Sequence, residues 1–135
     1  MRIGLRLAAA VAALWLAGCG SSSPVAPEGQ GSAQNFTGSV AAYGTTSHAV
    51  VVTRAETLTV TLTWAGGADL DLYLTGIDCT GYPPDNCLIL ARSTASSGTR
   101  EEIQWPAAAN DRFKIWVDNF SPTAASDYTV VTAVR

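Results

Sequence analysis

Few side chains in this 135-residue sequence could perform catalysis. His48 is the single histidine, and the adjacent Ser47 should point to the opposite face because the segment SHAVVV is typical of a strand. We therefore expect His48 to be an ordinary strand residue, at the surface or partly buried, without a catalytic role. The sequence contains no GxSxG, HExxH or glycine-rich phosphate-binding motif. We therefore predict that the protein is not an enzyme.

Acidic side chains offer a candidate metal site. Asp69 and Asp71 lie two residues apart on one face of an expected strand, about 7 Å from each other. Asp118 lies near the end of another expected strand, and oxygen clusters of this kind can hold Ca²⁺. The alternative is a solvated edge, or aspartates that accept hydrogen bonds from turn amides. Calcium is the one cofactor that the sequence suggests.

Two aromatic residues could form a ligand face. Tyr73 and Trp116 both point outward if their strands alternate regularly, whereas Trp64 belongs to an apolar inner face. Exposed aromatic rings beside acids can stack on a glycan or receive a peptide. The alternative is that these two rings cover the second side of a sheet.

The N-terminus has the pattern of an export signal. Two arginines precede an unbroken apolar run of ten residues, Leu7–Leu16, which would rise about 15 Å as a helix and is too short to span a bilayer of about 30 Å. The residues LAGC, ending at Cys19, resemble the lipobox of bacterial lipoproteins. We predict a signal peptide over residues 1–18 and a mature N-terminus in which Cys19 carries the lipid.

Residues 19–34 are expected to form a flexible tether between the lipid and a folded domain over residues 35–135. The tether is rich in Ser and Gly, and its r.m.s. reach would be roughly 20 Å. Because Gly20 rather than Asp follows the lipidated cysteine, the outer membrane is the favoured location within the bacterial cell envelope. The predicted partners are the membrane, through the lipid, and an envelope protein, peptide or glycan.

Two cysteines remain once Cys19 is assigned to lipid. Cys79 and Cys87 bound one turn-rich loop, and export would place them in an oxidising compartment. We predict a disulfide between them, which would stabilise the domain by roughly 2–3 kcal/mol. The alternative is a metal or redox pair, although the CxxC spacing is absent.

Apolar residues from position 35 onward recur with a period of two. The segment TLTVTLTW, residues 57–64, alternates threonine with apolar side chains as a half-buried strand would. Turn-rich segments separate about eight such strands, which predicts an all-β, two-sheet sandwich with jelly-roll-like crossings. The expected strands are Asn35–Tyr43, Thr46–Thr53, Thr57–Trp64, Asp69–Thr75, Leu88–Ser93, Arg100–Trp105, Arg112–Asn119 and Tyr128–Val134.

The charge pattern argues against nucleic-acid binding. The formal net charge is −3, and removal of Arg2 and Arg6 with the signal peptide would bring it to −5. The remaining basic residues are scattered and form no stripe that could neutralise phosphates. They are Arg54, Arg92, Arg100, Arg112, Lys114 and Arg135.

The order of the motifs LTVTLTW, ADLDLYL, ARS, EEI, FKIWVDNF and DYTVVTAV resembles the bacterial pre-peptidase C-terminal domain. The resemblance covers nearly all of residues 35–135 and implies a jelly-roll-like sandwich that serves secreted hydrolases as an accessory module. It also identifies Asp69 and Asp71 as the D-x-D pair of that family, some members of which bind calcium. The sequence departs from the family by its own lipid anchor, its cysteine-bounded loop and the lack of a catalytic domain.

Together these features predict a non-enzymatic cell-envelope lipoprotein that carries a β-sandwich binding or accessory module. The alternative is a structural or assembly lipoprotein whose partner is another envelope protein.

Overall fold

The computed structural model describes residues 33–81 and 87–135. The predicted signal peptide, Cys19 and the tether as far as residue 32 lie outside the described residues. Within the described part of the chain, no helix has the length and apolar character needed to cross a membrane.

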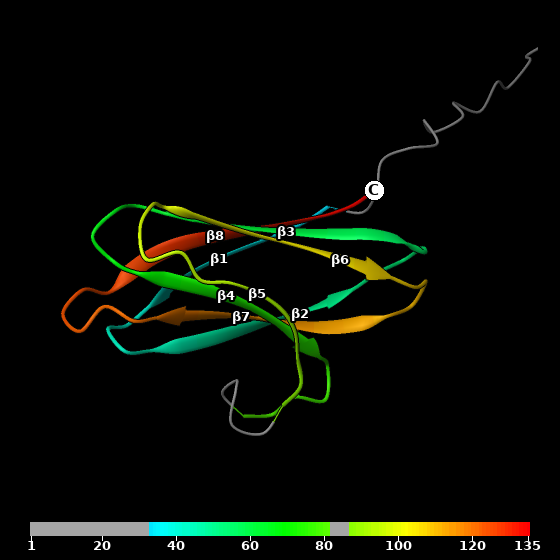
Figure 1. Ribbon diagram of the computed structural model, residues 1–135, viewed down its shortest axis with the longest axis horizontal. Coiled ribbons are helices and arrows are strands. Elements are labelled where there is room, and N and C mark those ends of the chain that lie inside the picture. Colours follow the sequence, from blue (N-terminus) through cyan, green and yellow to red (C-terminus); the bar gives the residue numbers. More distant parts are fainter. Residues whose placement is uncertain (1–32, 82–86) are drawn as a thin grey trace, which may run out of the picture.

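Eight strands form two four-stranded antiparallel sheets that pack face to face (Figure 1). One sheet has the order β1-β8-β3-β6 and the other β2-β7-β4-β5. Every connection except β4–β5 passes from one sheet to the other, as in a jelly roll. The strands are β1 (Gln34–Val40), β2 (Thr45–Val51), β3 (Glu56–Trp64), β4 (Leu70–Gly76), β5 (Ile89–Ser93), β6 (Arg100–Ala107), β7 (Arg112–Asn119) and β8 (Ser126–Val134). The predicted two-sheet sandwich of eight strands is confirmed.

The core lies where the apolar faces of the two sheets meet. In β3, Leu58, Val60 and Leu62 are fully buried, and they alternate with threonines on the outer face. In β4, Leu70, Leu72 and Leu74 are likewise without solvent exposure. Complete burial of one such side chain stabilises the fold by about 1.5–3 kcal/mol, so these two central strands anchor the sandwich.

A polar contact joins the sheets along the side formed by β1 and β2. The His48 ring of β2 stacks on Phe36 of β1, with ring centroids 4.7 Å apart. Its Nε2 atom lies 2.8 Å from the Tyr128 hydroxyl of β8, and burial lowers the pKa of the imidazole. His48 therefore has a packing role, because its ring contacts Phe36 and Tyr128 between the two sheets.

The four loops β1–β2, β3–β4, β5–β6 and β7–β8 gather at one end of the sandwich, on the left in Figure 1. We call this the distal end. The first strand begins at the opposite end, where Gln34 pairs with Thr132 of β8, and the chain ends there with Arg135 bonded to Thr57. A tether before residue 34 would therefore attach at the end remote from these loops.

Gly38 is needed for the ring of Tyr128 to cross β1. A Cβ atom at position 38 would lie 2.6 Å from the tyrosine hydroxyl oxygen. We expect Gly38→Ala to lower the free energy of unfolding by about 1–3 kcal/mol, because the buried ring and its bond to His48 must shift. Gly76→Ala is the matched control, since nothing lies within 4 Å of its Cβ. Equal urea midpoints for the two variants would contradict this account.

Candidate functional site

The predicted disulfide is confirmed. Cys79 and Cys87 are bonded, with their Cα atoms 5.6 Å apart, in the connection between β4 and β5. Cys79 is buried and packs against Tyr73 and Trp116 on the outer face of the β2-β7-β4-β5 sheet. The disulfide therefore closes a second, smaller apolar cluster on the side of this sheet away from the main core.

This cluster covers the aromatic face that the sequence offered for ligand binding. Tyr73 and Trp116 lie on the outer face as predicted, but each is only 8% exposed. The Trp116 indole donates a hydrogen bond to Thr75, and Lys114 lies over the indole ring while bonding the carbonyl of Cys79. The expectation of two exposed rings is thus corrected in favour of the alternative, because Cys79, Cys87 and Ile89 pack against them.

Two of the three predicted acidic residues lie side by side. Asp71 of β4 and Asp118 of β7 are directly opposite in the strand register, which places their Cβ atoms about 4.5–5.5 Å apart. Both residues are buried, at 8% and 5% exposure. The Tyr73 hydroxyl donates to Asp71 at 3.1 Å, and the Thr45 hydroxyl donates to Asp118 at 2.8 Å. Asp69 lies just before β4, half-buried.

The predicted calcium site is not assembled. In residues 33–81 and 87–135, no three His, Cys, Asp or Glu side chains come together in a way that could hold a metal ion. The aspartates are instead occupied by neighbouring hydroxyls from Tyr73 and Thr45.

The region around Asp71 is strongly acidic. Burial, reinforced by the charges of Asp69, Glu101 and Asp118, raises the pKa of Asp71 to about 6 against the lowering effect of the Tyr73 hydrogen bond. The same environment raises the pKa of the Tyr73 phenol, mainly through burial. Arg92 of β5, directly opposite Tyr73 in the strand register, is a cation beside these carboxylates.

A pocket opens beside Asp118 at the distal end, with a volume of about 280 Å³. We call it the distal pocket, and it is lined by Tyr43, Thr45, Asp118, Asn119 and Phe120. Tyr43 is 71% exposed and Phe120 is 46% exposed, so two aromatic rings are presented to solvent beside a buried carboxylate. Sequence reasoning missed both rings. The available signal was an aromatic residue inside each turn-like segment, AYGT and NFSP.

Asn119 holds the loops that carry these rings. Its side-chain nitrogen donates to the carbonyls of Ala41 at 3.0 Å and Ala124 at 2.7 Å, and its side-chain oxygen accepts from the amide of Ser121 at 2.9 Å. Asn119 is almost completely buried, at the last position of β7. A single amide therefore joins the β1–β2 and β7–β8 loops.

Backbone hydrogen bonds complete the arrangement of the loops. The amide of Tyr43 donates to Ser121, and the amide of Phe120 donates to Asp69 in the β3–β4 loop. Tyr43 has a φ of 52°, an uncommon value for a residue with a side chain. The hydrogen bonds fix this conformation and with it the direction of the exposed ring.

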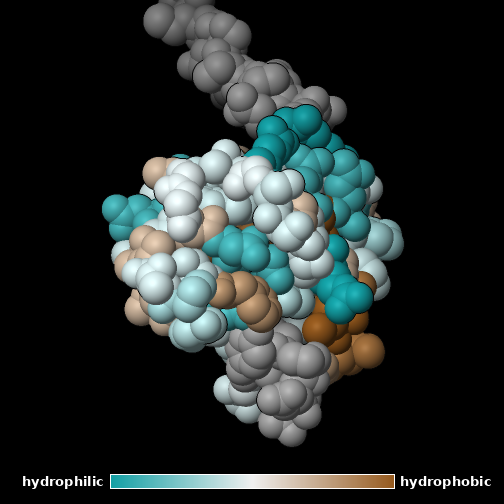
Figure 2. Space-filling view, turned by 60° about the vertical axis from the view of Figure 1, so that its left-hand side comes forward, coloured by the Kyte–Doolittle hydropathy of each residue, from teal (hydrophilic) through white to brown (hydrophobic). Residues whose placement is uncertain are grey.

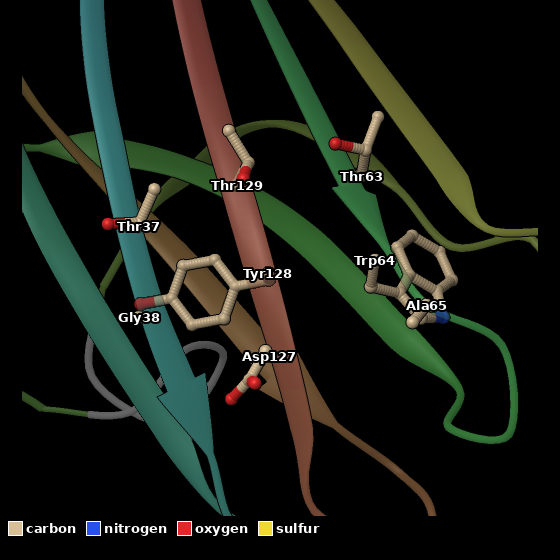
Figure 3. A pocket seen from close by; sticks show the side chains of 8 residues that line it. All are labelled: Thr37, Gly38, Thr63, Trp64, Ala65, Asp127, Tyr128 and Thr129. Carbon is tan, nitrogen blue, oxygen red and sulfur yellow. The ribbon is translucent and has the colours of Figure 1, made fainter.

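A groove runs across the outer face of the other sheet at the same end (Figure 3). Its volume is about 600 Å³, and the directly opposed residues Thr37, Thr129 and Thr63 of β1, β8 and β3 line one side. Asp127 and Ala65 line the other side. We call it the threonine groove. Its hydroxyl groups can donate and accept hydrogen bonds, and Asp127 adds a second acidic group to the distal end.

The face of the molecule that is seen in Figure 2 is mostly polar. In the view of Figure 2, pale and teal residues dominate, and strongly apolar colour is confined to small patches. Isolated exposed apolar residues are normal on a soluble surface, so they do not by themselves mark a site. The distal pocket is distinctive because its two exposed rings adjoin a buried carboxylate.

No protein-family model matches the sequence, and no curated protein matches it. Solved structures match in fold. PliG of Aeromonas hydrophila, a periplasmic inhibitor of g-type lysozyme, is 14% identical over 79% of this chain and 89% of that chain, with a TM-score of 0.54. The mitogen of Yersinia pseudotuberculosis is 15% identical over 78% and 87%, with a TM-score of 0.57.

The pre-peptidase C-terminal domain of a collagenase from Bacillus anthracis is also similar. It is 16% identical over 76% of this chain and 88% of that domain, with a TM-score of 0.52. This similarity supports the predicted pre-peptidase C-terminal-like fold. Identities this low establish the fold alone, so function must be argued from the site.

The raised pKa of Asp71 predicts a pH-dependent stability. Between about pH 4 and pH 6 the native state keeps a proton that the unfolded state has lost, because the ordinary pKa is 3.8. Stability should therefore fall as pH rises through this window. We expect Asp71→Asn to be more stable than the wild type at pH 7.5 by about 1–2 kcal/mol, and this advantage to disappear at pH 4.

Urea unfolding at the two pH values measures this difference. Asp127→Asn, which removes an exposed carboxylate at the same end, is the control and should show no comparable gap. An Asp71→Asn advantage of the same size at both pH values would show that burial of the charge is not its cause.

Proposed function

We propose that this chain is a non-enzymatic lipoprotein of the bacterial cell envelope whose distal end binds another protein. The observation that carries the proposal is the distal pocket, where Tyr43 and Phe120 are exposed on loops that Asn119 holds in place. Exposed aromatic residues on fixed loops are typical of binding surfaces, since they supply contact area at a low entropic cost.

The position at which the predicted tether would join the domain supports a distal end that faces away from the membrane. Gln34 and Arg135 lie at the end of the sandwich opposite to the distal loops (Figure 1). A lipid on Cys19, joined through residues 20–33, would hold the domain by that end. The distal loops would then face away from the membrane and be accessible to a partner. Residues 19–34 as tether, 35–135 as domain and the outer membrane as location are parts of the same proposal.

The presence of two hollows at the distal end favours a macromolecule as partner. The distal pocket opens beside the β2-β7-β4-β5 sheet and the threonine groove on the β1-β8-β3-β6 sheet, so both lie at one end but on different sides. A small ligand would occupy one of them. A protein that buries about 800 Å² on each partner can cover an end of a small domain and contact both.

The fold neighbours agree with binding rather than catalysis. PliG, by its title, inhibits g-type lysozyme and therefore acts on another protein, and the other neighbour is a C-terminal domain of a collagenase.

A photo-crosslinking amino acid at position 43 tests the proposed binding end. In cells of the source bacterium, we expect a discrete protein adduct of fixed mass from position 43. The matched control is position 131 on the outer face of β8, which is also exposed. Competition by excess purified wild-type protein should abolish the adduct. The same adduct from both positions, or none from position 43, would contradict a partner at the distal end.

The lipid anchor is tested separately. We expect Cys19→Ser to move the protein from the membrane fraction to the soluble envelope fraction while leaving the melting temperature of the domain unchanged. Intact mass should show acyl chains on a mature N-terminus at Cys19 in the wild type only. A membrane-bound Cys19→Ser protein, or an unacylated wild type, would refute the anchor.

A further inference from the structure

The distal pocket is small. Its volume of about 280 Å³ lies at the lower limit of the usual range of about 300–1,000 Å³ for small-molecule sites. Tyr43 and Phe120 flank it, and both rings are exposed and supplied by different loops. The pocket therefore suits a single protruding group of a larger partner rather than a complete small ligand.

The polar part of the pocket is acidic. Asp118 and the hydroxyl of Thr45 that donates to it lie in the lining, and Asp71 is the direct cross-strand neighbour of Asp118. The charges acting on Asp71 from Asp69, Glu101 and Asp118 are all negative. A carboxylate of a partner would be repelled here. A neutral sugar would stack on the rings but would carry no charge complementary to that of the carboxylates.

A cation can interact favourably with both the aromatic rings and the carboxylate of the pocket. Aromatic faces attract cations through the ring quadrupole, and a buried carboxylate forms stronger hydrogen bonds with a charged donor than with a neutral one. Arginine meets these requirements better than lysine, because its planar guanidinium can stack on a ring and donate to a carboxylate at the same time. Arginine and aromatic residues are also frequent at the energetic centres of protein interfaces.

We propose that the distal pocket binds one arginine side chain of the partner protein, with the guanidinium between Tyr43 and Phe120 and directed at Asp118. This inference rests on the proposed function and specifies the chemistry by which the partner is recognised. The partner would present a basic residue on a convex surface, complementary to the acidic distal end.

NMR titration of the full-length protein in detergent with the peptide acetyl-Gly-Arg-Gly-amide tests the proposal. We expect saturable shifts at Tyr43, Asp118 and Phe120, with a Kd on the order of 1 mM for so small a ligand. The isosteric citrulline peptide, which lacks the charge, should bind at least 10-fold more weakly. The lysine peptide should bind more weakly than the arginine peptide.

Single substitutions test whether the arginine peptide binds in the distal pocket. Tyr43→Ala changes an exposed residue and should raise the Kd several-fold without loss of folding, whereas Tyr43→Phe keeps the ring and should bind as the wild type does. Asp118→Asn should raise the Kd about 10-fold or more. Asp127→Asn, an exposed acid of the same end that lies in the threonine groove, should leave the Kd unchanged.

Three results would overturn the inference: equal affinity for the arginine and citrulline peptides, an equal effect of Asp118→Asn and Asp127→Asn, or shifts that do not include the distal pocket. The proposed function has an independent readout in the crosslink from position 43. A protein adduct at position 43 together with no arginine binding would leave the proposed function standing and reject this inference alone.

Discussion

The buried amide of Asn119 is the interaction on which the distal end depends. It stands at the last position of β7, where the core strands fix its backbone, and its side chain binds carbonyls in two loops that have no regular structure of their own. An unpaired amide in this interior would cost about 1–3 kcal/mol, so the loops are held where those hydrogen bonds are made. The folded sandwich thereby fixes the loops that carry Tyr43 and Phe120, although these two side chains contribute little to the core themselves.

The two outer faces of the sandwich have different roles because they are covered differently. On the β2-β7-β4-β5 sheet, the disulfide-bonded Cys79 and Cys87, together with Ile89, pack against the buried Tyr73 and Trp116. Farther along the same face, Asp71 and Asp118 remain next to an open pocket at the distal end.

Sequence reasoning was sufficient for the strands and for the disulfide. The alternation of threonine and apolar residues in β3 can be read directly, since each inward side chain must be apolar to bury its face. Cys79 and Cys87 had no other intramolecular partner once Cys19 was assigned to lipid. These inferences needed local pattern or elimination, and neither required knowledge of which strands are neighbours.

The site required information that the sequence does not contain. Alternation placed Tyr73 and Trp116 on an outer face but could not show that a loop would cover them. The pairing of Asp71 with Asp118 depends on the β4–β7 register, which joins residues 47 positions apart. Tyr43 and Phe120 lie in turns, where periodicity gives no signal, and their proximity results from the jelly-roll order of the strands.

The central claim is that Asn119 pre-organises the distal loops, and amide hydrogen exchange measures this most directly. The amides of Tyr43, Ser121 and Ala124 each donate within the loops. We expect all three to be protected in the wild-type protein and to lose protection together in Asn119→Ala, while the amides of β3 retain theirs. Exchange of these loop amides at the rate of an unstructured peptide in the wild type, or their undiminished protection in Asn119→Ala, would contradict the account.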